Sequence, residues 1–217
     1  MIITIKYTNE FKQVITEQQT KLMYYYNKET YINNELKYVH FFRNLKNVEE
    51  TQWWGGVYYI SDNEDKQTII NEYTSIGTTW TFYHDKEVSP YGNYTKWKYE
   101  FYYNGVLDRK SIEVYDQERL LIAACYVDLE TNELYHKRKM FYGDINFYER
   151  EDYRGCYLSV SYLEDNTVDK IYYNDNDLDD IDFVAYYNSY PETVRFDWMA
   201  HSYYHSFEPM IPTETIV

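Results

Sequence analysis

The sequence predicts a mainly β protein, built as an antiparallel meandering sheet with one short helix near its N-terminus. Three observations support this fold class. Tyrosine, which strands favour, accounts for 30 of the 217 residues. Short aromatic runs recur along the chain and end in Asn or Asp, the residues that close hairpins. Only seven glycines and four prolines occur, so we expect Asn and Asp to supply most turn positions with positive φ.

The N-terminal residues predict a short strand followed by the helix. Residues 2–7 alternate between apolar and polar side chains, as a short strand does. After them, Thr8 or Asn9 can cap a helix whose face has the spacing i, i+3, i+4, i+7 and i+11: Phe11, Val14, Ile15, Gln18 and Leu22. A strand over residues 12–20 is the alternative, but it places Val14 and Ile15 on opposite faces. No later stretch predicts a comparable helix.

An irregular repeat runs through residues 100–180. Its unit is an aromatic pair, a turn and a leucine, as in Tyr102-Tyr103-Asn104-Gly105-Val106-Leu107. Later copies begin near Val114, Tyr126, Ser161 and Ile171. Each unit predicts a strand that ends in an Asx turn and restarts near the leucine, so the series predicts an antiparallel meander, arranged as a sandwich or as an open or rolled sheet.

The tyrosine doublets have a geometric consequence. Because successive side chains of a strand point to opposite faces, each doublet places one ring on each face of the sheet. Either a second layer covers the outer face, or that face is an exposed aromatic platform. The doublets are Tyr58-Tyr59, Tyr102-Tyr103, Tyr172-Tyr173, Tyr186-Tyr187 and Tyr203-Tyr204.

The C-terminal region predicts a strand and a tail. Residues 194–200 alternate as a strand with one buried face, and residues 208–217 contain two prolines and are typical of a tail. No linker-like stretch occurs, so we expect residues 1–217 to form a single domain.

The formal net charge of −15 limits the classes of partner. It argues against direct nucleic-acid binding, which needs a basic patch, and against an anionic membrane surface. It favours a soluble protein and, for a macromolecular partner, a basic protein. The N-terminal residues do not have the pattern of a signal peptide, so the predicted location is the cytoplasm.

No pattern of catalytic or metal-binding residues stands out, and we predict no cofactor and no metal. The chain contains no GxSxG, HExxH or phosphate-binding glycine loop. Cys125 and Cys156 do not have zinc spacing. On a strand, His201 and His205 would lie about 13 Å apart, too far to share one metal. The run of aspartates from Asp175 lacks the glycine and the final glutamate of an EF-hand.

The repeat units at Tyr102–Leu107, Val114–Leu120 and Ile171–Leu178 resemble the MORN-like tyrosine-rich repeats of bacterial toxin–antitoxin and immunity proteins. The resemblance covers residues 100–180. It implies a meandering β-sheet protein without catalysis that binds a partner protein, for example by neutralising a cognate toxin.

The functional prediction is therefore a non-enzymatic acidic module that binds a basic protein, in the form of an immunity protein or inhibitor. Aromatic residues would anchor the partner and carboxylates would steer it. Alternatives are a carbohydrate-binding domain or glycosidase that uses surface Tyr and Trp, and a phage-type inhibitor that mimics nucleic acid. The predicted contact residues are Trp53, Trp54, Tyr58, Tyr102, Tyr172, Asp175, Asp177 and Asp179.

Overall fold

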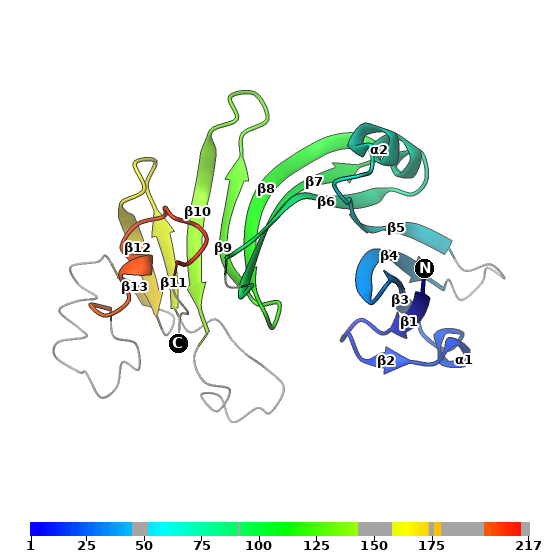
Figure 1. Cartoon of the computed structure of the whole chain (residues 1–217). Helices are drawn as coiled ribbons and strands as arrows, with labels where there is room; N and C mark the ends of the chain where they lie inside the picture. Colours follow the sequence, from blue (N-terminus) through cyan, green and yellow to red (C-terminus); the bar gives the residue numbers. More distant parts are fainter. Residues whose placement is uncertain (45–51, 91, 143–157, 174–175, 179–197, 214–217) are drawn as a thin grey trace. The chain divides into compact units, whose positions relative to one another are not determined.

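The computed structural model describes residues 1–44, 52–90, 92–142, 158–173, 176–178 and 198–213. The described part is mainly β, with 54% of its residues in strands and 10% in helices, and its strands form one open sheet. The sheet order is β13-β12-β11-β10-β9-β8-β7-β6-β5-β4-β3-β1-β2, so most neighbours are consecutive in sequence (Figure 1). The predicted antiparallel meander is confirmed in its open form.

The strands and helices have the following bounds. The strands are β1 (Ile3–Thr8), β2 (Val14–Ile15), β3 (Tyr25–Ile32), β4 (Glu35–Arg43), β5 (Gln52–Tyr59), β6 (Thr79–Val88), β7 (Tyr94–Tyr103), β8 (Val106–Asp116), β9 (Leu121–Val127), β10 (Leu134–Phe141), β11 (Leu158–Tyr162), β12 (Val168–Tyr173) and β13 (Asn176–Leu178). The helices are α1 (Glu17–Thr20), α2 (Lys66–Thr74) and the 3-10 helix η2 (Ser202–Tyr204).

The chain divides into two compact units. The first unit comprises residues 1–86 and 98–110, and the second comprises residues 87–97 and 111–217. Each unit has its own buried cluster of hydrophobic side chains. That the whole chain behaves as a single domain stays a prediction.

The N-terminal helix is shorter than the spacing of apolar residues predicts. The side chain of Asn9 accepts hydrogen bonds from the backbone N–H groups of Phe11 and Gln13, at 3.0 and 2.9 Å, and Lys12 has a φ of 60°. These features form a turn where the helix was expected, and Val14 continues into strand β2. The helix begins only after Thr16, whose side chain and that of Gln19 form a capping box.

Helix α2 is a feature that the sequence analysis missed. It lies between β5 and β6, which are parallel neighbours in a sheet dominated by antiparallel pairs. Parallel neighbours need a crossover connection, and α2 supplies it. The Asp65 side chain caps its first turn by accepting a hydrogen bond from Thr68 N–H at 2.7 Å.

The core of the first unit lies between α2 and one face of the sheet. Ile70 of α2 is buried with aromatic side chains of β5 and β6, among them Trp80 and Phe82. The two glycines after Trp54 allow the strands to approach closely, because a Cβ on Gly55 would lie 2.0 Å from the carbonyl oxygen of Thr79. The glycines of Trp53-Trp54-Gly55-Gly56 thus permit a close backbone approach, and a register shift lies beside them in β4.

The hairpin turns carry the chemistry that the repeat predicts. Six of the nine non-glycine residues with positive φ among the described residues are Asn or Asp. Asn104, at 48°, and Gly105, at 77°, form the two-residue turn between β7 and β8. At the end of β8, Asp116 accepts hydrogen bonds from the N–H groups of Glu118 and Leu120, at 2.9 and 2.8 Å. Asx turns therefore end the strands, as expected.

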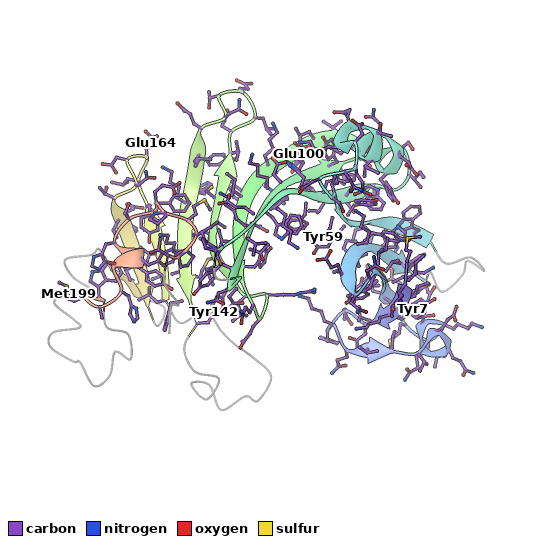
Figure 2. The ribbon with its side chains drawn as sticks, viewed as in Figure 1. Tyr7, Tyr59, Glu100, Tyr142, Glu164 and Met199 are labelled. Carbon is purple, nitrogen blue, oxygen red and sulfur yellow. The ribbon has the colours of Figure 1, made fainter. Side chains whose placement is uncertain are left out.

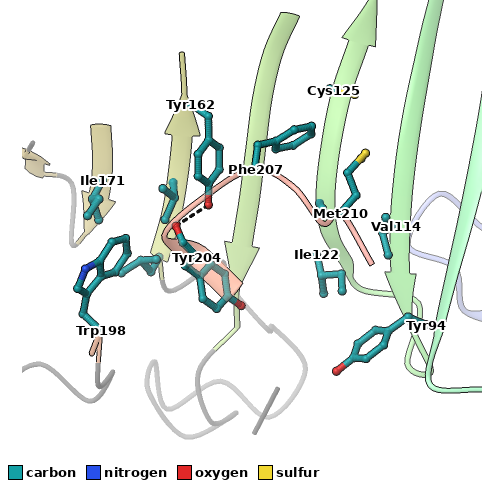
Figure 3. Packing of buried hydrophobic residues seen from close by; sticks show 13 residues of the cluster. Tyr94, Val114, Ile122, Cys125, Tyr162, Ile171, Trp198, Tyr204, Phe207 and Met210 are labelled. Atoms are coloured by element: carbon teal, nitrogen blue, oxygen red, sulfur yellow. Dashed lines mark hydrogen bonds between the residues drawn. The ribbon is translucent and has the colours of Figure 1, made fainter. Parts of the chain in front are cut away.

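The core of the second unit lies between its strands and the C-terminal segment, residues 198–213. Val114, Leu158 and Ile171 of the sheet are fully buried, and Phe207 of the segment is buried with them (Figure 3). The Tyr162 hydroxyl donates a hydrogen bond to the Tyr204 carbonyl at 2.8 Å, which holds η2 on the sheet.

Several C-terminal predictions need correction. Residues 198–200 form a turn and residues 202–204 form η2, so the doublet Tyr203-Tyr204 is not on a strand; residues 194–197 lie outside the described part. Residues 208–213 are not a free tail, because Met210 is only 6% exposed within the core. The segment contains two prolines, as the sequence analysis noted. Its apolar side chains nevertheless pack against a face of the sheet.

Lys139 fastens the C-terminal segment to the sheet. This lysine of β10 is fully buried, and its ammonium group donates to three backbone carbonyls, those of Tyr203, Ser206 and Pro209, at 2.7, 2.8 and 2.9 Å. It also lies 3.5 Å from the ring centre of Tyr203. Leaving water is costly for a charge, so burial lowers the pKa of Lys139 to about 7, and the three carbonyls offset part of that cost when the amine is protonated.

We expect Lys139→Met to destabilise the protein by about 3 kcal/mol, because it leaves three inward carbonyls without a donor. The C-terminal segment should then exchange its amide hydrogens much faster than β7 does. Urea unfolding and hydrogen exchange measure the two effects. Arg138→Met, at the exposed neighbouring position, is the control. An equal loss of stability in both variants would contradict the role given to the three hydrogen bonds of Lys139.

His40 makes the stability of the first unit sensitive to acid. Its ring lies among aromatic rings, with Trp53 at 4.7 Å and Trp80 at 5.9 Å between centres. Burial, with a smaller effect of Lys28, lowers the pKa of His40 from 6.5 to about 4. Between those two pH values the unfolded chain binds the proton and the folded chain does not, so stability falls as the pH drops.

Through His40, the free energy of unfolding of the wild type should fall by at most about 3 kcal/mol between pH 7 and pH 4. We expect that His40→Phe does not show this part of the loss. The measurement is urea unfolding at several pH values for both proteins. The difference between their stabilities should be nearly constant above pH 7 and grow in favour of the variant below pH 6. Parallel curves for the two proteins would show that His40 does not titrate as described.

Candidate functional site

The predicted contact residues fall into separate places in the fold. Trp53 and Tyr58 belong to the core of the first unit, where Tyr58 is only 6% exposed, and Tyr102 packs beside them. Trp54 instead contacts Phe41, with 5.4 Å between ring centres.

The remaining predicted contacts belong to the second unit. Tyr172 of β12 is 42% exposed and pairs in register with Asp177 of β13. Asp175 and Asp179 lie outside the described residues. The structure thus brings Tyr172 and Asp177 together, and it places Tyr58 among packing residues rather than at a surface.

The second unit presents a cluster of carboxylates in the turns at one end of its strands, which we call the acidic edge. It comprises two turns, residues 128–133 and residues 163–167, and neither turn contains a Lys or Arg. Lys137 joins them, since it lies on β10 just after the first turn and donates hydrogen bonds to the carbonyl of Glu164 and the side chain of Asn166, both at 2.7 Å. Figure 2 shows Glu164 at the tip of the second turn. The carboxylates are Asp128, Glu130, Glu133, Glu164 and Asp165.

Two of these carboxylates are part of the turns themselves. Asp128 accepts hydrogen bonds from the backbone N–H groups of Thr131 and Glu130, which lower its pKa. The side-chain hydroxyl and backbone N–H of Thr167 lower the pKa of Asp165 in the same way. Both groups therefore stay ionised in mild acid. The three glutamates of the edge are exposed and extend the negative charge into solvent.

Apolar side chains lie between the charges of the acidic edge. Leu129 follows Asp128 and is 42% exposed, and Leu163 begins the second turn and is 50% exposed. Tyr135, just after the first turn, is 42% exposed and contacts Tyr126, with 5.6 Å between ring centres. A few apolar anchors surrounded by charge are typical of protein-binding surfaces.

A partly buried ionic network in the first unit is a second cluster that the sequence analysis missed. Lys66 of α2 donates to Glu100 of β7 at 2.7 Å, and the Tyr102 hydroxyl donates to the other oxygen of Glu100 at 3.0 Å. The Nε2 of His84 lies 3.6 Å from Glu100. Burial alone would raise the pKa of Glu100, but hydrogen bonds from His84 and Lys66 outweigh it and lower the pKa to about 2.

This network is suited to holding α2 on the sheet. Glu100 stays ionised and is occupied by its donors, so it is a poor general acid or base at neutral pH. The four groups come from α2, β6 and β7, and Lys66 is 34 residues from Glu100 along the chain. No local motif indicates such a cluster.

Neither a metal site nor a membrane-spanning helix is found in the described part of the chain. No group of three or more His, Cys, Asp and Glu side chains there could hold a metal ion. His201 and His205 flank η2 rather than lying on a strand. None of the described helices is long and apolar enough to cross a membrane.

Comparison with known proteins gives no relative. No family model, no curated protein and no solved structure matches this chain. The resemblance to MORN-like repeat proteins of toxin–antitoxin and immunity systems therefore stays a prediction.

Substitution can separate packing residues from surface residues among the predicted contacts. We expect Tyr58→Ala to cost about 3 kcal/mol or more, because it empties a buried site and leaves Glu64 without the hydroxyl that donates to it at 3.0 Å. Tyr172→Ala should cost less than about 1 kcal/mol. Thermal and urea unfolding measure both, and Tyr103→Ala, at a side chain 55% exposed, is the matched surface control.

Proposed function

We propose that this protein binds a basic protein partner through the acidic edge of its second unit. The observation that carries the proposal is the joining of two lysine-free, arginine-free turns, with five carboxylates and two half-exposed leucines. Carboxylates steer a basic partner and raise its association rate, and Leu129 and Leu163 supply apolar contact once it has docked. The overall charge of −15 acts in the same direction.

In its narrower form, the proposal is a non-enzymatic immunity protein or inhibitor. It would neutralise a basic nuclease or another DNA-binding protein by occupying the surface with which that protein binds phosphates. An acidic edge fits such a surface because both the edge and the phosphate backbone present closely spaced negative charges. Co-expression with a toxic basic protein from the same host tests the narrower form, with restored growth as the expected result.

The acidic edge itself is tested with a charge variant, Glu130→Gln/Glu133→Gln/Glu164→Gln. These three side chains are exposed, and the turn-forming Asp128 and Asp165 are left intact. Wild-type protein is used to capture partners from its native host, and association kinetics with the captured protein are then measured against salt. We expect the wild-type on-rate to fall steeply with salt and the variant to lose about tenfold at low salt.

The control carries the same charge change in the first unit, as Glu10→Gln/Glu35→Gln/Glu72→Gln, at exposed positions. It should change the on-rate less than twofold. A salt-independent on-rate, or equal effects of the two variants, would contradict the proposal. A specific sugar bound on a glycan array by both variants would favour the carbohydrate-binding alternative instead.

A further inference from the structure

The outer edge of β1 carries backbone groups that no described strand pairs. On one side, β1 pairs with β3 along its whole length, from Ile3 to Thr8. On the other side, β2 pairs only with Tyr7 and Thr8. Residues 3–6 therefore form the sheet edge within the described residues, beside the short strand β2 (Figure 1).

The direction of the free groups follows from the antiparallel pattern. In an antiparallel strand, alternate residues direct their N–H and C=O groups to the same neighbour. The Ile2 carbonyl accepts a hydrogen bond from Asn33 N–H at 2.8 Å, so residues 2, 4 and 6 face β3. Ile3 and Ile5 consequently direct their backbone groups outward, as does Tyr7 toward β2.

On one face of the strand, the side chains of this edge are apolar and exposed. Ile3 is 57% exposed and Ile5 is 48% exposed, and both lie on the same face of the strand. Proteins usually protect such an edge with inward charges, proline or a covering segment. The one charged residue here, Lys6, lies on the other face with its ammonium group 4.7 Å from the ring centre of Tyr31.

We propose that β1 pairs antiparallel with β1 of a second copy of this chain, with the two Thr4 residues opposite each other at a two-fold axis. This register places Ile3 against Ile5 of the other copy twice, so all four outward-facing residues form hydrogen-bonded pairs. In this register both Ile3 and Ile5 find backbone partners. Tyr7 needs none, because it is already paired with β2.

The register is also free of electrostatic conflict and buries the exposed apolar edge. Lys6 stands opposite Ile2 of the other copy, so the two Lys6 residues lie about 13 Å apart along the strands. The apolar side chains of Ile3 and Ile5 come to lie beside those of the partner on one face. A two-fold pairing of this kind closes on itself and gives a dimer rather than a fibre.

Cysteine cross-linking tests the register. In a non-hydrogen-bonded antiparallel pair the opposing Cα atoms are about 4.5 Å apart, within reach of a disulfide. Thr4→Cys should therefore form a covalent dimer on mild oxidation. Lys6→Cys, on the same face of β1, should not, and wild-type protein gives the background from its own cysteines. Equal cross-linking of the two variants would overturn the register.

Sedimentation equilibrium tests the pairing without a covalent bond. The apparent mass of the wild type should rise with concentration from 26.7 kDa toward twice that value. Ile3→Lys/Ile5→Lys should stay at 26.7 kDa, and Leu22→Lys/Val106→Lys, with the same charge change at exposed apolar positions of the same unit, should behave as the wild type. A wild type that is monomeric at every concentration would overturn the proposal.

Discussion

The three hydrogen bonds from Lys139 to the backbone of the C-terminal segment are the interaction on which the second unit depends. An open sheet with aromatic and aliphatic side chains on its faces needs a cover, and a chain segment without strands has many backbone groups to satisfy. Lys139 contributes to both, because its side chain is buried between the sheet and the segment and its amine donates hydrogen bonds to three backbone carbonyls of the segment. Phe207 and Met210 of the segment are then part of the buried core.

The first unit uses the same principle with a helix as its cover. Lys66, at the start of α2, is tied to Glu100, while Lys37 of β4 reaches Glu64 in the connection that leads to the helix. Lys37 also donates to the carbonyl of Tyr59 at 2.8 Å. Isolated surface ion pairs contribute little, but Lys37, Glu64 and Glu100 are mostly buried, so these pairs help to fix where the crossover connection lies.

The sequence predicted what is local and missed what is not. Turn chemistry acts within a few residues, so the Asx turns at Asp116 and Asp128 could be recognised, and with them the meander. Helix α2 has few apolar residues and is held by partners in β6 and β7, so its periodicity alone was too weak to predict it.

The N-terminal helix shows the opposite failure, in which local chemistry overrode an apparent period. The hydrogen bonds of Asn9 and the positive φ of Lys12 break the chain inside the predicted helical face. The same locality explains the site predictions. Burial of Tyr58 depends on α2, and the sequence analysis did not predict that helix. The charge of the acidic edge, in contrast, follows directly from the residue types of its two turns.

The distribution of lysines connects the fold to the proposed function. Lys37, Lys66, Lys137 and Lys139 all direct their ammonium groups to carbonyls or carboxylates that hold covers and turns in place. Lys37 and Lys66 each pair with a carboxylate, so the field of these two charges is largely cancelled at short range. The three glutamates of the acidic edge are exposed to water, and the ammonium group of Lys137, between the two turns, offsets only part of the charge of the five carboxylates. The chain thus uses these lysines for contacts that hold its own segments in place, and it leaves the exposed carboxylates of the acidic edge for the proposed partner.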